Sequence, residues 1–282
     1  MKTKNLLVTI AITAVLFMLI SCKKENATVI NVAEQETTFE LSTGQAVADN
    51  ITEDANGVFM EAAATKNLLG SNSQTVITTN SITGAVVTVS PVSGFPKTIS
   101  IDFGNGCTSS NGITHKGKII VVLSDSVRKA GSTAAINFTN YYVNGFKKEG
   151  TVTWTNTSTA AAKGWQRKVE KGKITAPDGR YWIHSGIRDA VQIAGTNTPN
   201  TLLDDIFLIT GNHTVTDAAG KTRECFITEA LEKKTVCDNI CTGKLKVQGD
   251  SHIAVIDFGN GDCDKLATIS IDGGAPRTIV LR

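Results

Sequence analysis

The segment AINFTNYYV-NG-FKKEGTVTWT, residues 135 to 155, decides the fold. Two runs rich in β-branched and aromatic residues flank Asn144-Gly145, the strongest short signal for a two-residue hairpin turn. Strand alternation places Val152 and Trp154 on one face and the neighbouring threonines on the other, so we expect Trp154 in the core. The segment therefore predicts an antiparallel β-hairpin.

The same pattern continues on both sides of this hairpin, from about residue 73 to residue 282. Turn sequences separate the runs at residues 177 to 179, 217 to 220 and 272 to 274. Lone glycines that interrupt a run predict β-bulges. These glycines are Gly117, Gly150, Gly186, Gly211 and Gly243. The sequence predicts a mainly β domain over residues 39 to 282, built as an antiparallel sandwich, an open barrel or an extended twisted sheet.

One N-terminal amphipathic helix is expected over about residues 43 to 66. Its apolar residues recur at three- and four-residue steps, with acidic residues between them. The apolar positions are Val47, Ile51, Ala55, Val58, Phe59 and Ala62. We expect this stripe to pack on the β domain, and recruitment of a partner protein is the alternative. Gly57 costs the helix about 1 kcal/mol relative to alanine.

The first residues carry a targeting signal. Lys2 and Lys4 precede an apolar stretch at residues 6 to 20, which is shorter than the roughly 20 residues of a membrane span. Leu-Ile-Ser-Cys at residues 19 to 22 resembles the bacterial lipobox. We expect residues 1 to 21 to be a lipoprotein signal peptide and Cys22 to be lipidated. An ordinary signal peptide or a transmembrane anchor is the alternative.

The charge excludes nucleic acid as a partner. The chain has 28 basic and 26 acidic residues, and removal of Lys2 and Lys4 leaves 28 − 2 = 26 of each. Residues 22 to 38 are expected to form a flexible tether to the membrane. Lys23 after the lipidated cysteine favours the outer membrane. Lys24-Glu25 is faintly similar to a signal for cell-surface lipoproteins.

Five cysteines remain after Cys22, and an envelope location permits disulfides. They are Cys107, Cys225, Cys237, Cys241 and Cys263. Two bridges and one free thiol could form in 15 ways. We favour Cys237 with Cys263. A metal site of Cys237, Cys241 and His252 is the alternative, although its spacing matches no common zinc pattern.

A short repeat occurs near both ends of the β region. Ile-Asp-Phe-Gly-Asn-Gly stands at residues 101 to 106 and again at residues 256 to 261. It predicts two related hairpins at the two ends of the sheet. Asp257, Asp262 and Asp264 could offer oxygen ligands to Ca²⁺, but a hairpin turn explains both copies without metal. No other cofactor is indicated.

Aromatic residues cluster in the middle of the chain. Tyr141, Trp165, Tyr181 and Trp182 are candidates for a platform that stacks on a glycan, and burial in the core is the alternative. The sequence has no Gly-x-Ser-x-Gly, His-Glu-x-x-His or Rossmann motif, so it indicates no catalytic residue. The four histidines are far apart in the sequence and are interpreted as strand residues.

The lipobox, the Ile-Asp-Phe-Gly-Asn-Gly-Cys segment at residues 101 to 107 and the closing segment at 257 to 281 together resemble a group of Bacteroidetes-type cell-envelope lipoproteins. The group has no assigned activity, so the resemblance implies a location and an all-β fold. The expected function is a lipid-anchored, non-catalytic domain that binds a glycan or protein partner or is structural. The alternative is a hydrolase with its residues dispersed over the sheet.

Overall fold

The computed structural model describes residues 24–70 and 78–282, with side chains from residue 32 onward. The predicted signal peptide and Cys22 lie outside the described residues. The helix is α1 (Lys24–Thr65). The strands are β1 (Val86–Ser90), β2 (Lys97–Asp102), β3 (Cys107–Thr108), β4 (Thr114–Leu123), β5 (Thr133–Val143), β6 (Phe146–Asn156), β7 (Gly164–Thr175), β8 (Tyr181–Ala194), β9 (Ile206–Asp217), β10 (Thr222–Lys234), β11 (Thr242–Gln248), β12 (Ile253–Asn260), β13 (Leu266–Ile271) and β14 (Arg277–Val280).

The strands form one antiparallel sheet in which almost every strand pairs with its neighbours in the chain. The path runs from β1 and β2 through β4 to β14, and β3 adds to β4. Val143 pairs with Phe146 across Asn144-Gly145, whose positive φ angles of 47° and 84° suit the tight hairpin turn. The antiparallel, mainly β prediction is confirmed. The form is a single open sheet, so the sandwich is wrong.

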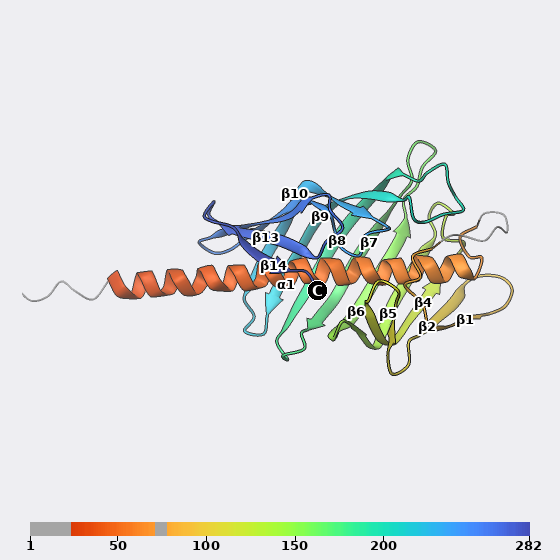
Figure 1. Ribbon diagram of the computed structural model, residues 1–282, viewed down its shortest axis with the longest axis horizontal. Helices are drawn as coiled ribbons and strands as arrows, with labels where there is room; N and C mark the ends of the chain where they lie inside the picture. Colours follow the sequence, from red (N-terminus) through yellow and green to blue (C-terminus); the bar gives the residue numbers. More distant parts are fainter. Residues whose placement is uncertain (1–23, 71–77) are drawn as a thin grey trace, which may run out of the picture.

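The sheet curves around α1, which runs along the long axis of the molecule (Figure 1). The helix contacts β2 near one end of the strand path and β8 to β13 towards the other. Its predicted apolar stripe is buried, and one hydrophobic core contains residues of both the helix and the strands, Trp154 among them. The expected packing of the helix on the β domain is therefore confirmed.

The helix is longer than the sequence pattern predicted. We expected a flexible tether at residues 22 to 38, but α1 already begins at Lys24. Contacts with the sheet explain the helical structure of this segment from Glu34 onward. Glu34 pairs with Arg223 of β10 at 2.9 Å, and Glu36 pairs with Arg277 of β14 at 2.9 Å. Tertiary contacts of this kind stabilise a helix even where its sequence has only a weak apolar periodicity.

The acidic side of the helix is also buried. Asp49, Glu53 and Glu61 are all less than 10% exposed, although an amphipathic helix normally turns such residues to water. The reason is the curvature of the sheet, which surrounds the helix and leaves no broad solvated face. The buried acids therefore need partners inside the protein.

The lone glycines of the strands fall into two groups. The pairing register shifts at Gly117, Gly150 and Gly243, so the predicted bulges are confirmed there. Gly186 and Gly211 lie in continuous pairing between β8 and β9. On their other sides, Gly211 falls within the register shift between β9 and β10, and Gly186 borders the shift between β7 and β8. A Cβ atom on either residue would lie 2.3 Å from a carbonyl oxygen of the neighbouring strand, so close backbone approach also requires glycine at these two positions.

The repeated Asp-Phe-Gly segments have the same local structure. Oδ1 of Asp102 accepts a hydrogen bond from the Gly104 N–H at 2.9 Å, and Oδ1 of Asp257 does the same for Gly259. The phenylalanine between them is buried in both copies. Asp102 stands at the end of β2 before a turn, whereas Asp257 lies inside β12, which continues to Asn260. β2 lies near one edge of the sheet and β12 near the other.

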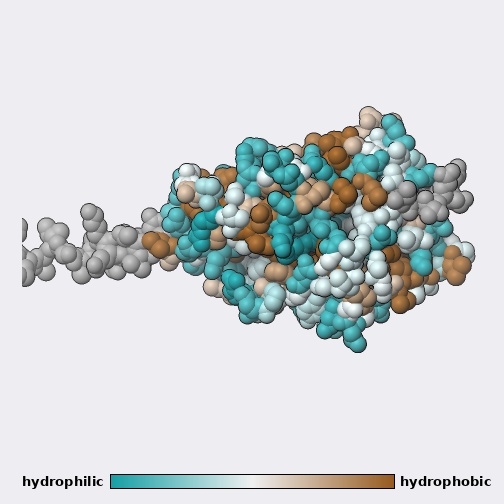
Figure 2. Space-filling model, in the orientation of Figure 1, coloured by the Kyte–Doolittle hydropathy of each residue, from teal (hydrophilic) through white to brown (hydrophobic). Residues whose placement is uncertain are grey.

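The outer surface shown in Figure 2 mixes hydrophilic residues with small apolar patches, without one broad apolar area on that face. Within residues 24–70 and 78–282, no helix combines the length and the apolar character that a membrane crossing requires. The functional groups of interest lie inside the curved sheet.

Candidate functional site

A series of ion pairs connects α1 with the strands around it. Four acids of the helix each meet a different arginine, three of them in strands and the fourth, Arg282, after β14. The pairs are Glu34 with Arg223 (2.9 Å), Asp49 with Arg188 (3.1 Å), Glu53 with Arg167 (2.5 Å) and Asp54 with Arg282 (2.8 Å). Apart from Glu34, every one of these side chains is less than 10% exposed. We call this set the ion-pair ladder.

Asp54 has the densest set of partners in the ladder. Besides Arg282, it accepts hydrogen bonds from Nε2 of His115 at 2.9 Å and from the Tyr141 hydroxyl at 3.2 Å. Burial opposes ionisation of Asp54, but His115 and Arg282 together hold the pKa of its carboxyl well below its usual range. Burial and the Asp54 carboxylate raise the pKa of the Tyr141 hydroxyl. Asp54 is therefore a permanent negative charge.

A lysine and two histidines extend the polar interior beyond the ladder. Nζ of Lys148 donates to Oγ1 of Thr52 on α1 at 2.9 Å, and burial lowers the pKa of Lys148 to about 7. The rings of His184 and His213 lie 6.0 Å apart. Burial lowers the pKa of both imidazoles, so both are neutral at pH 7. Both histidines lie on strands, as the sequence predicted, and the pairing of β8 with β9 brings them together although they are far apart in the sequence.

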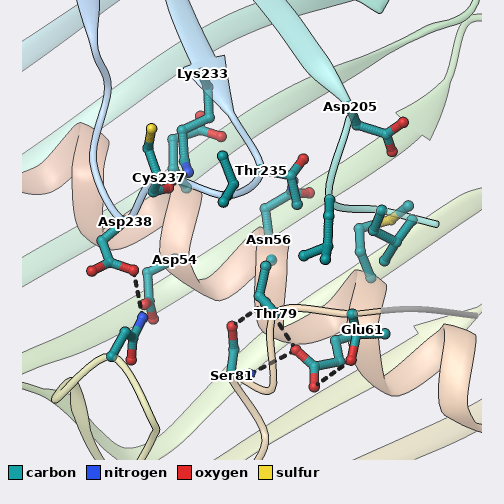
Figure 3. Close-up of a pocket in the computed structure, with 18 of the residues that line it drawn as sticks. Asp54, Asn56, Glu61, Thr79, Ser81, Asp205, Lys233, Thr235, Cys237 and Asp238 are labelled. Atoms are coloured by element: carbon teal, nitrogen blue, oxygen red, sulfur yellow. Dashed lines mark hydrogen bonds between the residues drawn. The ribbon is translucent and has the colours of Figure 1, made fainter. Parts of the chain in front are cut away.

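A cavity of about 240 Å³ lies between the C-terminal half of α1 and the loops before β9 and after β10 (Figure 3). Its apolar wall includes Met60, Ile113, Trp165, Leu202 and Phe207. Its polar wall includes Glu53, Asp54, Asn56, Glu61, Asp205, Lys233, Thr235, Asp238 and Arg282. The combination of an apolar wall with convergent polar groups is typical of a small-molecule site.

Gly57 of α1 borders this cavity. A Cβ atom built on Gly57 would have no neighbour within 4 Å. Gly44 of the same helix differs, because a Cβ there would lie 3.0 Å from the Trp182 ring. Packing explains Gly44, but it does not explain why Gly57 occupies a helix interior at a cost of about 1 kcal/mol. The glycine leaves the cavity open.

Glu61 holds the chain segment that closes one side of the cavity. Its carboxylate accepts hydrogen bonds from the hydroxyls of Thr78 and Thr79, both at 3.1 Å, and from the N–H of Ser81 at 2.7 Å. Figure 3 shows Thr79 and Ser81 turned toward Glu61. The Glu61 carboxylate therefore fixes the position of this segment.

Asp205 and Lys233 are the cavity groups whose pKa values lie close to neutral pH. Burial, assisted by the neighbouring Asp204, raises the pKa of Asp205 to about 7. Burial lowers the pKa of Lys233 to about 8. Oδ1 of Asp205 accepts a hydrogen bond from Nε2 of Gln192 at 2.7 Å. The ladder and this cavity were missed from the sequence, because their members come from strands far apart in the chain.

The predicted aromatic platform does not form an exposed row. Tyr141 and Trp165 are buried in the core, and Trp182 is half-buried against the helix at Gly44. Tyr181 lies under Nζ of Lys173, 4.1 Å from the ring centre. The reason is the curvature of the sheet, which turns one face of each strand inward. Of the four, only Trp165 borders the cavity.

The predicted disulfide between Cys237 and Cys263 is present, with its Cα atoms 5.0 Å apart. Cys107, Cys225 and Cys241 are free thiols. Because Cys237 is in a disulfide, the alternative metal site with Cys241 and His252 is wrong.

The acids considered for Ca²⁺ have other roles. Oδ1 of Asp257 accepts the N–H of Gly259 within β12, and Oδ1 of Asp264 accepts the N–H of Leu266, both at 2.9 Å. Among the residues that the structure describes, no three His, Cys, Asp or Glu side chains are grouped to hold a metal, and Asp262 joins no such group.

No protein-family model, no curated protein and no solved structure matches this chain.

Proposed function

We propose that the protein is a lipid-anchored lipoprotein of the cell envelope, attached to the outer membrane through Cys22, which binds a small ligand in the cavity beside α1 and does not catalyse a reaction. The observation that carries the binding function is the cavity at Gly57. A helix-interior glycine with empty space above it destabilises the helix and leaves room for a bound molecule.

The helix supports the anchoring part of the proposal. In Figure 1 the N-terminal part of α1 projects beyond the sheet. Ten residues separate Lys24 from Glu34, which pairs with β10, and a helix of that length rises about 15 Å. A lipid at Cys22 would then hold the domain at a distance from the headgroups by a helical spacer and not by a coil.

Two substitutions at Gly57 test the binding function. Gly57→Ala adds one methyl group and leaves most of the cavity open, whereas Gly57→Phe fills it from the same position. Saturation-transfer NMR with a library of small envelope metabolites should detect ligands of the wild type and of Gly57→Ala, but not of Gly57→Phe. Equal binding by all three proteins would place the ligand elsewhere and contradict the proposal.

Substitution of Cys22 tests the anchor. Cys22→Ser should move the protein from the membrane fraction to the soluble fraction of cells, because the acyl chains would be missing. Retention of the variant in the membrane fraction would contradict lipid anchoring without affecting the cavity.

A hydrolase is the second candidate, and Asp205 is the observation that favours it. A carboxyl with a pKa of about 7 in a cavity is suited to general acid or base catalysis. Hydrolysis of a chromogenic ester or glycoside by the wild type, reduced at least a hundredfold in Asp205→Asn, would favour this function over binding alone.

A further inference from the structure

The unused hydrogen-bonding groups of the cavity are mainly acceptors. Asp205 uses Oδ1 for Gln192, and Asp238 uses Oδ1 for Nδ2 of Asn111. Each carboxylate has a second oxygen, and Arg128 interacts electrostatically with the carboxylate of Asp205. Oδ1 of Asn56 is buried in the cavity wall without a partner in the described part of the chain. A ligand that satisfies these oxygens must donate hydrogen bonds.

The cationic groups of the cavity wall are already engaged. Arg282 pairs through Nη1 with Asp54, donates from Nε to Asn239 at 3.1 Å, and donates from Nη2 to a backbone carbonyl at 2.5 Å. Nζ of Lys233 donates to the carbonyl oxygens of Lys234 and Cys237. Neither cation is therefore well placed to bind an anionic ligand.

The formal charge of the wall favours a cation. Five carboxyl side chains and two cationic side chains border the cavity, which leaves 5 − 2 = 3 more acidic groups than basic ones. The carboxyls are Glu53, Asp54, Glu61, Asp205 and Asp238. Arg167 pairs with Glu53 and Arg128 acts on Asp205 from outside this wall, so 5 − 4 = 1 acidic group stays in excess, which attracts positive ligands.

The opposite wall suits an apolar body. Trp165 packs against Phe207 with ring centres 4.1 Å apart, and Met60 and Leu202 border the same space. Trp165 is 8% exposed, and its indole N–H has no partner in the described residues. Aromatic rings bind apolar groups and also attract cations through their faces.

We infer that the cavity binds a small organic cation, an ammonium or guanidinium group on an aromatic or branched apolar body, with the cationic group at Asp205 and Asp238 and the apolar body against Trp165 and Phe207. This inference rests on the proposed binding function and names its ligand class. Asp205 accepts the strongest contact, because its carboxyl is the more deeply buried of the two.

Four probes that differ in charge test the ligand class. Isothermal titration calorimetry compares 2-phenylethylammonium with the neutral 2-phenylethanol, the anionic 3-phenylpropanoate and the neutral disaccharide maltose. A charge-assisted hydrogen bond changes affinity by roughly ten- to a hundredfold. We therefore expect the ammonium probe to bind at least about tenfold more tightly than the other three.

Asp205→Asn and Asp204→Asn form a matched pair of variants. Asp204 is adjacent in sequence, does not border the cavity, and accepts a hydrogen bond from the Thr198 hydroxyl at 2.6 Å. Asp205→Asn should lower the affinity for 2-phenylethylammonium about tenfold, and Asp204→Asn should leave it within about twofold of the wild type. Equal effects of the two variants would overturn the role of Asp205.

The outcomes separate this inference from the proposed function. Preferential binding of the alcohol, the carboxylate or maltose, abolished by Gly57→Phe, would overturn the cation class and leave the binding cavity supported. If the ammonium probe does not bind and Gly57→Phe changes no titration, both the ligand class and the cavity's function are contradicted.

Discussion

The ion pair between Glu53 and Arg167 allows a sharp test of the polar interior. Arg167 of β7 is 2% exposed, Glu53 of α1 is 8% exposed, and the two side chains meet at 2.5 Å. Glu53→Gln keeps the shape of the side chain but leaves the guanidinium buried without a counter-charge. Removal of one member of a buried pair costs about 3 to 5 kcal/mol.

The expected change is large enough to measure directly. At about 2 to 4 °C per kcal/mol for a domain of this size, Glu53→Gln should lower the Tm by about 6 to 20 °C. Urea unfolding followed by tryptophan fluorescence would give the free energy of unfolding for the same variant. The double variant Glu53→Leu with Arg167→Met should recover most of that loss, because it removes both charges and keeps apolar volume.

A surface pair on the same strand provides the control. Lys168 and Glu170 of β7 meet at 2.8 Å, but their side chains are 51% and 52% exposed. Glu170→Gln should cost less than about 1 kcal/mol. If Glu53→Gln and Glu170→Gln destabilise the protein equally, the buried pair contributes no more to stability than the surface pair, which contradicts the prediction.

Three further predictions concern other parts of the molecule. Gly57→Ala should stabilise the protein by about 1 kcal/mol, because alanine has a higher helix propensity than glycine and its Cβ would meet no neighbouring atom. A lower Tm of this variant would contradict the open space at Gly57. Replacement of Cys237 and Cys263 by serine should cost about 3.5 kcal/mol for a separation of 26 residues in the chain-entropy treatment, and unchanged urea unfolding would count against the bridge. Lys148 has a pKa of about 7 in the folded protein against an ordinary value of 10.5, so the unfolded chain binds more protons between these pH values and this lysine makes stability rise with pH. Lys148→Met should remove that rise, which urea unfolding at pH 7 and pH 10 would show, and the same pH dependence in both proteins would contradict it.

Local signals explain how much of the fold could be predicted. Asn144-Gly145 specifies its hairpin because only residues tolerant of positive φ fit that turn. The meander then follows, since each strand pairs with the next one along the chain. A lone glycine in a strand signals either a bulge or a close approach, and the difference depends on the neighbouring strand: Gly186 borders a register shift towards β7 and approaches the backbone of β9 closely.

The candidate site could not be predicted in the same way. Arg188 and Asp49 are 139 residues apart, and the alternation of β8 shows only that Arg188 faces one side of the sheet. A charged residue on a strand is normally placed toward water. The inward position follows from the helix inside the sheet, which no local pattern indicates. For the same reason Tyr141 and Trp165 were open to two interpretations until the curvature was known.

The meander also explains why the ladder lies where it does. Contacts between neighbouring strands join residues close in sequence, so they define each hairpin without fixing how far the whole sheet bends. The helix supplies the long-range contacts, such as Glu34 with Arg223, 189 residues apart. An interface of small apolar residues alone would tolerate several positions of a helix in a curved sheet. Charged pairs at four points along α1 are satisfied together in one position only, because any shift leaves a buried charge without its partner. The same placement puts Gly57 on the wall of the cavity that Trp165 and Asp205 also border, so the position of the helix and the shape of the cavity are determined by one set of contacts.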